Sequence, residues 1–334
     1  MNQTLNIQKS LFQQIRNKLD AHLSLVYEIS KLLNISYDSA YRRIRGDKKL
    51  SMSELFQLCT HFEISVDALF NIDNKNIIFN SKALDSKHFD FDQYLNLILK
   101  DINNIKKHEN KEIIYSAKDI PIFHLFQIPE LVAFKKFLWL KTVLQFSEYE
   151  DKLFSIKEIP EETLKIGKQI LNIYITIPTV ELWNEETINS LLRQIEFYFE
   201  SGIFANKEDA LILCEKLNDL ISHIQKQAEY GFKFLYNNDP LGNEQNYKLY
   251  YNEVILGDNT IFSIMDNEKV TYLTYNVLSL LITKEPYFCL QIEESLRNLM
   301  KKSSLISAVS EKERNRFFNK LYEKIGKLED KVKS

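Results

Sequence analysis

The sequence predicts a chain of two folded parts: an all-α domain over residues 1–72, and a larger, mostly helical α+β domain over residues 94–334 with a small antiparallel sheet. Apolar residues recur at helical spacing in the first part. This periodicity is lost between residues 73 and 93, where Asn, Asp and Ser become frequent, so we place a linker there. Short β-branched and aromatic runs gather between residues 245 and 290, which favours strands in that region.

Composition restricts the class of protein. The chain has 334 residues, of which 45% are hydrophobic and 27% charged, as expected for a globular protein with room for two cores. No stretch reaches the roughly 18 consecutive apolar residues that a membrane span needs, and the N-terminus lacks the pattern of a signal peptide. The three cysteines are odd in number and far apart, which predicts buried, reduced thiols. We therefore expect a cytoplasmic protein.

Three apolar stripes predict helices in the first part. No proline occurs before Pro121, so nothing in this region forbids a helix, and Ser51 or Ser53 can cap the last stripe. The stripes are Leu11, Phe12, Ile15 and Leu19, then Val26, Ile29, Leu32 and Leu33, then Leu55, Leu58, Cys59 and Phe62.

The second part mixes two kinds of pattern. Helical periodicity covers several segments: 94–107, 129–146, 160–174, 185–201, 207–236, 292–302 and 310–333. Residues 112–129 are compatible with a short strand pair or with an extended loop. Turn signals separate short β-type runs, which predict three or four antiparallel strands near 254–256, 260–264, 270–275 and 287–291.

Positive charge is concentrated in one short segment. Residues 37–49 hold five Lys and Arg against two Asp, a net charge of +3, whereas the whole chain carries −3. The rest of the chain therefore sums to −6. A basic patch on an acidic protein is the pattern expected for a polyanion partner.

The same segment reads as a short capped helix. Ser36 suits the N-cap, and Gly46 follows Arg45 where a left-handed residue would end the helix. Ala40 and Ile44 share one face of this helix, and the opposite face carries Asp38, Arg42 and Arg45 beside Ser39 and Tyr41. A basic helix face of this size fits the DNA major groove, where arginine can bind guanine and flanking lysines can neutralise phosphates.

At this point the sequence resembles a known family. Residues 24–70, SLVYEISKLLNISYDSAYRRIRGDKKLSMSELFQLCTHFEISVDALF, are similar to the lambda-repressor-like (XRE-type) helix-turn-helix, in the BetR-like variant of bacterial regulators. The small residue of the family's first motif helix falls on Ser30, its turn on residues 34–36, and its glycine on Gly46. The resemblance implies a five-helix DNA-binding domain whose third helix, about Tyr37 to Arg45, enters the major groove. The sequence departs from the family at Asn34, where glycine is frequent, and at Arg43, where an apolar residue is usual.

These patterns predict a bacterial transcription regulator. Arg42, Arg45 and Arg43 would supply base and phosphate contacts, and which of them reads bases stays open. The full set of predicted DNA-binding residues is Ser36, Tyr37, Asp38, Ser39, Tyr41, Arg42, Arg43, Arg45, Lys48 and Lys49. The alternative is that the arginines form a solvated face and the small domain docks on a protein partner.

The larger domain would serve oligomerisation, partner binding or sensing. Its last helix carries an apolar seam that packs either on its own domain or against a second subunit: Phe318, Leu321, Ile325, Leu328 and Val332. We expect a homodimer, because regulators of this kind read two half-sites, and a small-molecule effector is a further candidate partner. The sequence has no glycine-rich phosphate loop, nucleophile elbow or metal-ligand spacing, so we expect no enzyme, no catalytic residues, no metal and no cofactor.

Overall fold

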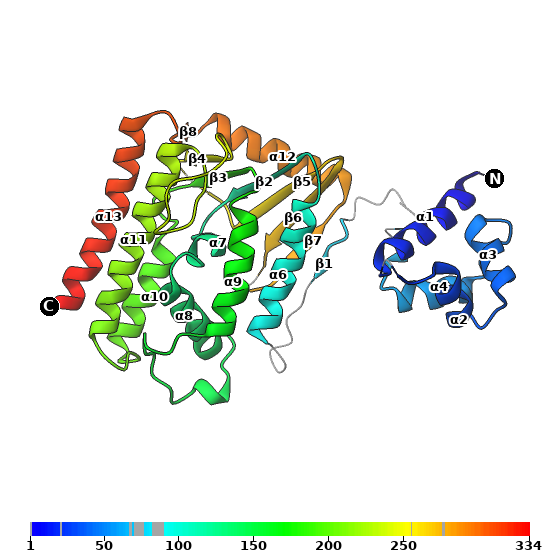
Figure 1. Ribbon diagram of the computed structural model, residues 1–334, viewed down its shortest axis with the longest axis horizontal. Helices are drawn as coiled ribbons and strands as arrows, with labels where there is room; N and C mark the ends of the chain where they lie inside the picture. The colour runs from blue at the N-terminus through cyan, green and yellow to red at the C-terminus, as the bar shows by residue number, and fades with distance from the viewer. Residues whose placement is uncertain are drawn as a thin grey trace. The chain divides into compact units, whose positions relative to one another are not determined.

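The computed structural model describes residues 2–20, 22–66, 69, 77–81, 90–254, 256–275 and 278–334. These form two compact units, Met1–Ile78 and Phe79–Ser334 (Figure 1). Most of the predicted linker, residues 73–76 and 82–89, lies outside the described set. Of its described residues, 77 and 78 belong to the first unit and the others to the second, where Asn80–Ser81 is strand β1 and Phe91 begins a helix.

The first unit, as far as it is described, is built from helices. They are α1 (Asn2–Lys18), α2 (Leu25–Leu32), α3 (Tyr37–Arg45) and α4 (Met52–His61). The predicted stripes supply most of its core, in which Leu11, Ile15, Ile29 and Leu58 are fully buried, and Ala40 of α3 is fully buried beside them. A fifth helix, which the family resemblance implies, would fall on residues that are mostly outside the described set.

The second unit is built on an eight-stranded mixed sheet with the order β1-β7-β6-β5-β2-β3-β4-β8. Strands β2, β3 and β4 run parallel to one another, and the remaining neighbours pair antiparallel. The other strands are β2 (Lys111–Ser116), β3 (Thr179–Trp183), β4 (Tyr247–Tyr251), β5 (Thr260–Met265), β6 (Glu268–Thr274), β7 (Leu280–Thr283) and β8 (Ser304–Leu305).

The expectation of a mostly helical domain with a small antiparallel sheet is wrong. The parallel part of the sheet pairs segments that are 66 residues apart for β2 and β3 and 68 residues apart for β3 and β4, and such long-range pairing leaves little local signal. Strand β3 was not predicted, because its five residues are all buried and do not alternate. The run 287–291 lies in a helix instead of a strand, because the Glu285 side chain accepts hydrogen bonds from the backbone N–H groups of Tyr287 and Phe288. Val254 and Leu256 lie outside the strands.

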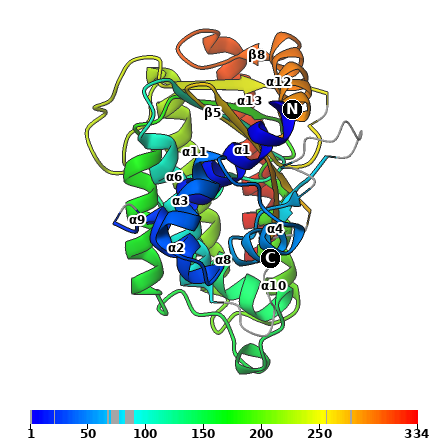
Figure 2. The same ribbon diagram turned by 90° about the vertical axis from the view of Figure 1, so that its right-hand side faces the viewer.

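Helices cover both faces of this sheet (Figures 1 and 2). Helix α12 (Pro286–Lys301) packs on one face over Ile114 and Phe262. Neighbouring residues of β2 point to opposite sides, so Ile113 and Tyr115 join the larger core under the other helices. These are α6 (Phe91–Lys106), α7 (Ile122–Leu125), α8 (Pro129–Leu138), α9 (Glu161–Tyr174), α10 (Asn189–Glu200), α11 (Glu208–Tyr230) and α13 (Glu311–Lys333), with a π-helical turn at Trp139–Val143 and a 3-10 turn at Ser147–Tyr149.

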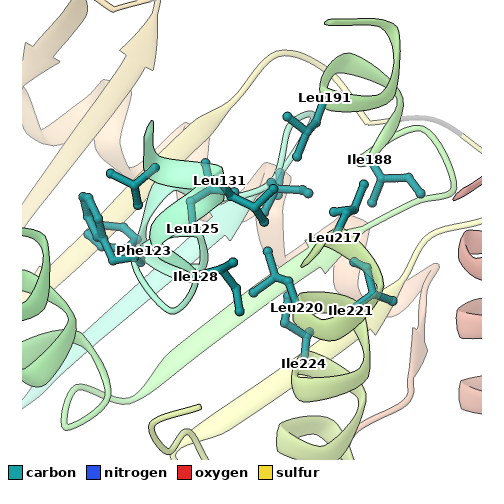
Figure 3. Packing of buried hydrophobic residues seen from close by; sticks show 14 of the residues in the cluster. Phe123, Leu125, Ile128, Leu131, Ile188, Leu191, Leu217, Leu220, Ile221 and Ile224 are labelled. Carbon is teal, nitrogen blue, oxygen red and sulfur yellow. The ribbon is translucent and has the colours of Figure 1, made fainter. Parts of the chain in front are cut away.

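The larger core is continuous from α7 to α13. Figure 3 shows Leu125, Ile128 and Leu131 facing Leu217 and other apolar residues of α11. The five seam residues of α13 are all buried against α10 and α11 of the same unit. Because this seam is already covered, it does not supply a surface for a second subunit.

A buried carboxylate lies on β3, the middle one of the three parallel strands. Glu181 of β3 is fully buried, and its oxygens lie 2.8 Å from His124 Nε2, 2.8 Å from Trp183 Nε1 and 3.1 Å from the Tyr247 hydroxyl. Burial alone would raise the pKa of Glu181, but His124 and the donors around it hold this pKa below its usual range. A carboxylate whose oxygens are hydrogen-bonded is tolerated in a core, which explains how a buried strand can contain glutamate.

No helix in the described part of the chain is long and apolar enough to cross a membrane. Cys59, Cys214 and Cys289 are buried and form no disulfide bond, as the sequence predicts for buried, reduced thiols.

Candidate nucleic-acid interface

Helix α3 is fixed at both ends by its own sequence. At its start the Ser36 hydroxyl accepts a hydrogen bond of 3.3 Å from the backbone N–H of Ser39. At its end Gly46 adopts φ 86°, and the N–H groups of Asp47 and Lys48 donate to the Arg42 carbonyl at 2.8 and 3.1 Å. The chain therefore leaves the helix axis immediately after Arg45. Asn34, in the turn before the helix, has φ 52°, a left-handed conformation that asparagine tolerates.

Arg43 lies on the inward side of α3. It is 4% exposed, and its Nη1 donates to the Ser39 carbonyl at 3.1 Å while its Nη2 lies 2.5 Å from Glu54 Oε1. Glu54 also completes the capping box of α4, because it accepts a hydrogen bond of 2.9 Å from the backbone N–H of Ser51. The hydrogen bond from Arg43 holds the pKa of Glu54 below its usual range. Arg43 thus joins α3 to α4 and does not share the exposed basic face.

The outward side of α3 carries the other basic groups. Arg42 and Arg45 are exposed, and Tyr37 and Tyr41 expose 56% and 51% of their surface. The Arg45 guanidinium lies over the Tyr41 ring, 5.7 Å from its centroid, and its Nε lies 3.5 Å from Asp47 Oδ2. These contacts orient Arg45 without removing it from solvent.

The turn after α3 is held from α1 by a residue that sequence reasoning missed. The Gln8 side chain is 8% exposed and donates from Nε2 to the carbonyls of Arg43 at 2.7 Å and Lys48 at 2.8 Å. Its Oε1 accepts a hydrogen bond of 3.2 Å from the backbone N–H of Leu50. Gln8 therefore positions the segment that carries Lys48 and Lys49. The available signal was that Gln8 lies three and four residues before Leu11 and Phe12, on their buried stripe.

The predicted DNA-binding residues fall into three groups by exposure. Arg43 is buried and Ser39 is partly buried. The others are exposed and belong to α3, its N-cap or the turn that follows: Ser36, Tyr37, Asp38, Tyr41, Arg42, Arg45, Lys48 and Lys49. The arrangement brings four cations to one short helix and its C-terminal turn. Such groups can bind phosphates and base edges.

Groups of three or more His, Cys, Asp or Glu side chains that could hold a metal ion are absent from the described ranges. Comparison with protein-family models, curated proteins and solved structures gives no match to this chain. The geometry of α3 and its supports is therefore the basis on which a function can be proposed.

Proposed function

We propose that this chain is a cytoplasmic, sequence-specific DNA-binding transcription regulator in which α3 enters the major groove. The observation that carries the proposal is the exposed face of a doubly capped helix, on which Arg42 and Arg45 project while Arg43 is held inward by Glu54. A rigid helix with a cationic face can dock in the groove without ordering its own backbone on binding.

The cations divide into two roles. Arg42 lies in the last turn of α3 and has no acidic partner within the described residues, so it is free to fork onto guanine O6 and N7. Lys48 and Lys49 follow the glycine turn and are exposed, which suits non-specific phosphate contacts. We assign base reading to Arg42 and charge neutralisation to the lysines.

The second unit would set the assembly and response of the regulator. A homodimer would place two α3 helices on two half-sites about 34 Å apart, the repeat of one turn of DNA. Because the seam of α13 is buried within its own unit, this dimer must form through another surface. Light scattering of the full-length protein measures its mass and tests this part of the proposal.

The central experiment is a selection from a random duplex DNA library with the full-length protein. We expect a defined motif, bound with an affinity that falls about 10²-fold between 50 and 200 mM salt if four phosphates are neutralised. The double substitution Arg42→Ala and Arg45→Ala should abolish enrichment, whereas Arg193→Ala, at an exposed arginine of α10, should leave it unchanged. Failure to enrich any motif would contradict the proposal.

A protein partner is the second candidate function of the first unit. Helix α4 exposes Met52 and Phe56 by 80% and 70%, and large exposed apolar side chains favour protein contacts over DNA contacts. Binding that depends on Phe56 and is insensitive to salt would favour this function.

A further inference from the structure

The second unit encloses a cavity of about 330 Å³ between α6 and the sheet. Ile98 and Ile102 of α6 form one wall, and Ile113 of β2 and Ile261 of β5 form the facing wall. The volume lies at the lower end of the range typical of small-molecule sites. The cavity can therefore hold a compact ligand with an apolar body.

One side of this cavity carries hydrogen-bond donors. Lys135 of α8 donates from Nζ to Gln194 Oε1 at 2.8 Å, and Gln194 Nε2 donates to Ser190 Oγ at 3.1 Å. The Lys135 ammonium also lies over the Trp139 ring, 5.5 Å from its centroid. These four side chains form the donor wall of the cavity.

The four side chains of the donor wall include no negatively charged acceptor. Within the described residues Lys135 makes no ion pair, and burial lowers its pKa to about 8 despite the charge of Asp119. The indole N–H of Trp139, a side chain that is 6% exposed, has no hydrogen-bond partner in the described part of the chain. A buried donor without an acceptor is costly, so an acceptor supplied from outside would stabilise the indole N–H of Trp139. A negatively charged acceptor would also stabilise the ammonium of the partly buried Lys135.

Other charged groups line the cavity and bear on which ligand fits. Lys118 is paired with Asp258 at 2.8 Å, and Asp101 has a partner of its own. Asp119 lines the cavity but lies too far from Lys135 for an ion pair. The ammonium thus lacks a near counter-ion, which a ligand carboxylate can provide.

We propose that this cavity binds a small monocarboxylate with an apolar body, the carboxylate on the donor wall and the body between α6 and the sheet. Charge-assisted hydrogen bonds to an ammonium are stronger than neutral ones, so the carboxylate gives both affinity and orientation. This binding is independent of whether the first unit recognises DNA.

The test uses titration calorimetry of the full-length protein at pH 7 with octanoate, octan-1-ol and octylamine as probes. Octanoate should bind at least about ten-fold more tightly than octan-1-ol, because a carboxylate accepts a charge-assisted hydrogen bond from the ammonium whereas a hydroxyl is a neutral acceptor. Octylamine should bind most weakly, because its ammonium would face that of Lys135.

Three variants locate the site. Lys135→Met removes the ammonium but keeps an unbranched apolar side chain, and it should remove the preference for octanoate while octan-1-ol still binds. Ile98→Phe fills the cavity and should weaken both probes. Lys168→Met, at an exposed lysine of α9, should change neither affinity. Thermal unfolding of each variant shows that it is folded before its titration is interpreted.

Four outcomes would overturn the proposal. They are absence of octanoate binding to the wild type, octylamine or octan-1-ol binding as tightly as octanoate, unchanged octanoate affinity in Lys135→Met, and unchanged affinity in Ile98→Phe.

Discussion

Arg43 of α3 and Glu54 of α4 form an ion pair, with Arg43 Nη2 2.5 Å from Glu54 Oε1 and the two side chains 5% and 19% exposed. Because Glu54 is also part of the capping box of α4, the pair couples the position of α3 to the start of α4. The basic face of α3 is therefore held in orientation by a contact that lies behind it.

Glu54→Gln should loosen α3 and α4. The substitution leaves the mostly buried guanidinium without its carboxylate, which costs about 2 kcal/mol for a pair that is not fully buried. Hydrogen exchange of α3 and α4 peptides in the full-length protein measures the loss of protection, and Glu28→Gln, at a partly exposed acid of α2 that makes no ion pair in the described part of the chain, is the matched control. Equal protection in the two variants would show that the ion pair does not hold α3.

Lowering the pH should have the same effect as this substitution. The pKa of Glu54 is held low in the folded state, chiefly by the hydrogen bond from Arg43. Its contribution is therefore present above the ordinary pKa of glutamate and is lost as the pH falls through the folded value. Hydrogen exchange of the same peptides at pH 7 and pH 4, corrected for the intrinsic rates, should show the wild type approaching Glu54→Gln at the lower pH.

Gln8→Ala should destabilise the turn that follows α3. The substitution removes the partners of two carbonyls and one N–H, and each buried unsatisfied group costs roughly 1–3 kcal/mol. Exchange of the amides of residues 46–50 should accelerate, whereas Gln13→Ala, at an exposed position of the same helix, should leave them protected. If the amides of residues 46–50 exchange at the same rate in both variants, Gln8 does not stabilise this turn.

Local sequence signals account for α3 better than for its surroundings. The serine cap, the glycine turn and the apolar spacing of Ala40 are readable within a few residues. Arg43 follows Ala40 by three positions and so lies about 60° from it, toward the buried side of the helix. Arg43 pairs with Glu54, which is 11 residues away in sequence, and its carbonyl accepts a hydrogen bond from Gln8, which is 35 residues away. Only the folded unit brings these residues together.

The sheet of the second unit was harder to predict for the same reason. Strand β3 carries Glu181 in the middle of a short buried run, and a carboxylate there argues against a central strand. The groups that make it tolerable, His124 and Tyr247, belong to distant segments. The cavity beside Lys135 is also lined by side chains from several helices and strands, so no single segment of the sequence predicts it.

His223 should make the stability of the second unit depend on pH. Its Nε2 lies 2.9 Å from the Phe234 carbonyl, and burial, aided by the charges of His124 and Lys226, lowers its pKa from 6.5 to about 4. As the pH falls, the unfolded chain therefore takes up the proton first, and stability is lost between about pH 6.5 and 4. Between pH 7 and 5 this loss should be about 2 kcal/mol.

Urea unfolding of the wild type and of His223→Gln at both pH values isolates this contribution, because the other titrating groups are common to the two proteins. The difference between them should shrink at pH 5 relative to pH 7. A difference that is the same at both values would show that His223 is not held neutral by its site.

Arg42→Ala and Lys48→Ala should weaken DNA binding in different ways. Arg42 is assigned to a base, so its loss should remove about 1–3 kcal/mol of discrimination between the selected motif and variants of one base pair. Lys48 is assigned to phosphate, so its loss should weaken all sequences alike and reduce the slope of log affinity against log salt by about 1. Competition binding over a salt series measures both quantities. Because the two residues are only six positions apart and both exposed, identical behaviour would mean that α3 and its turn bind DNA through charge alone, without reading its sequence.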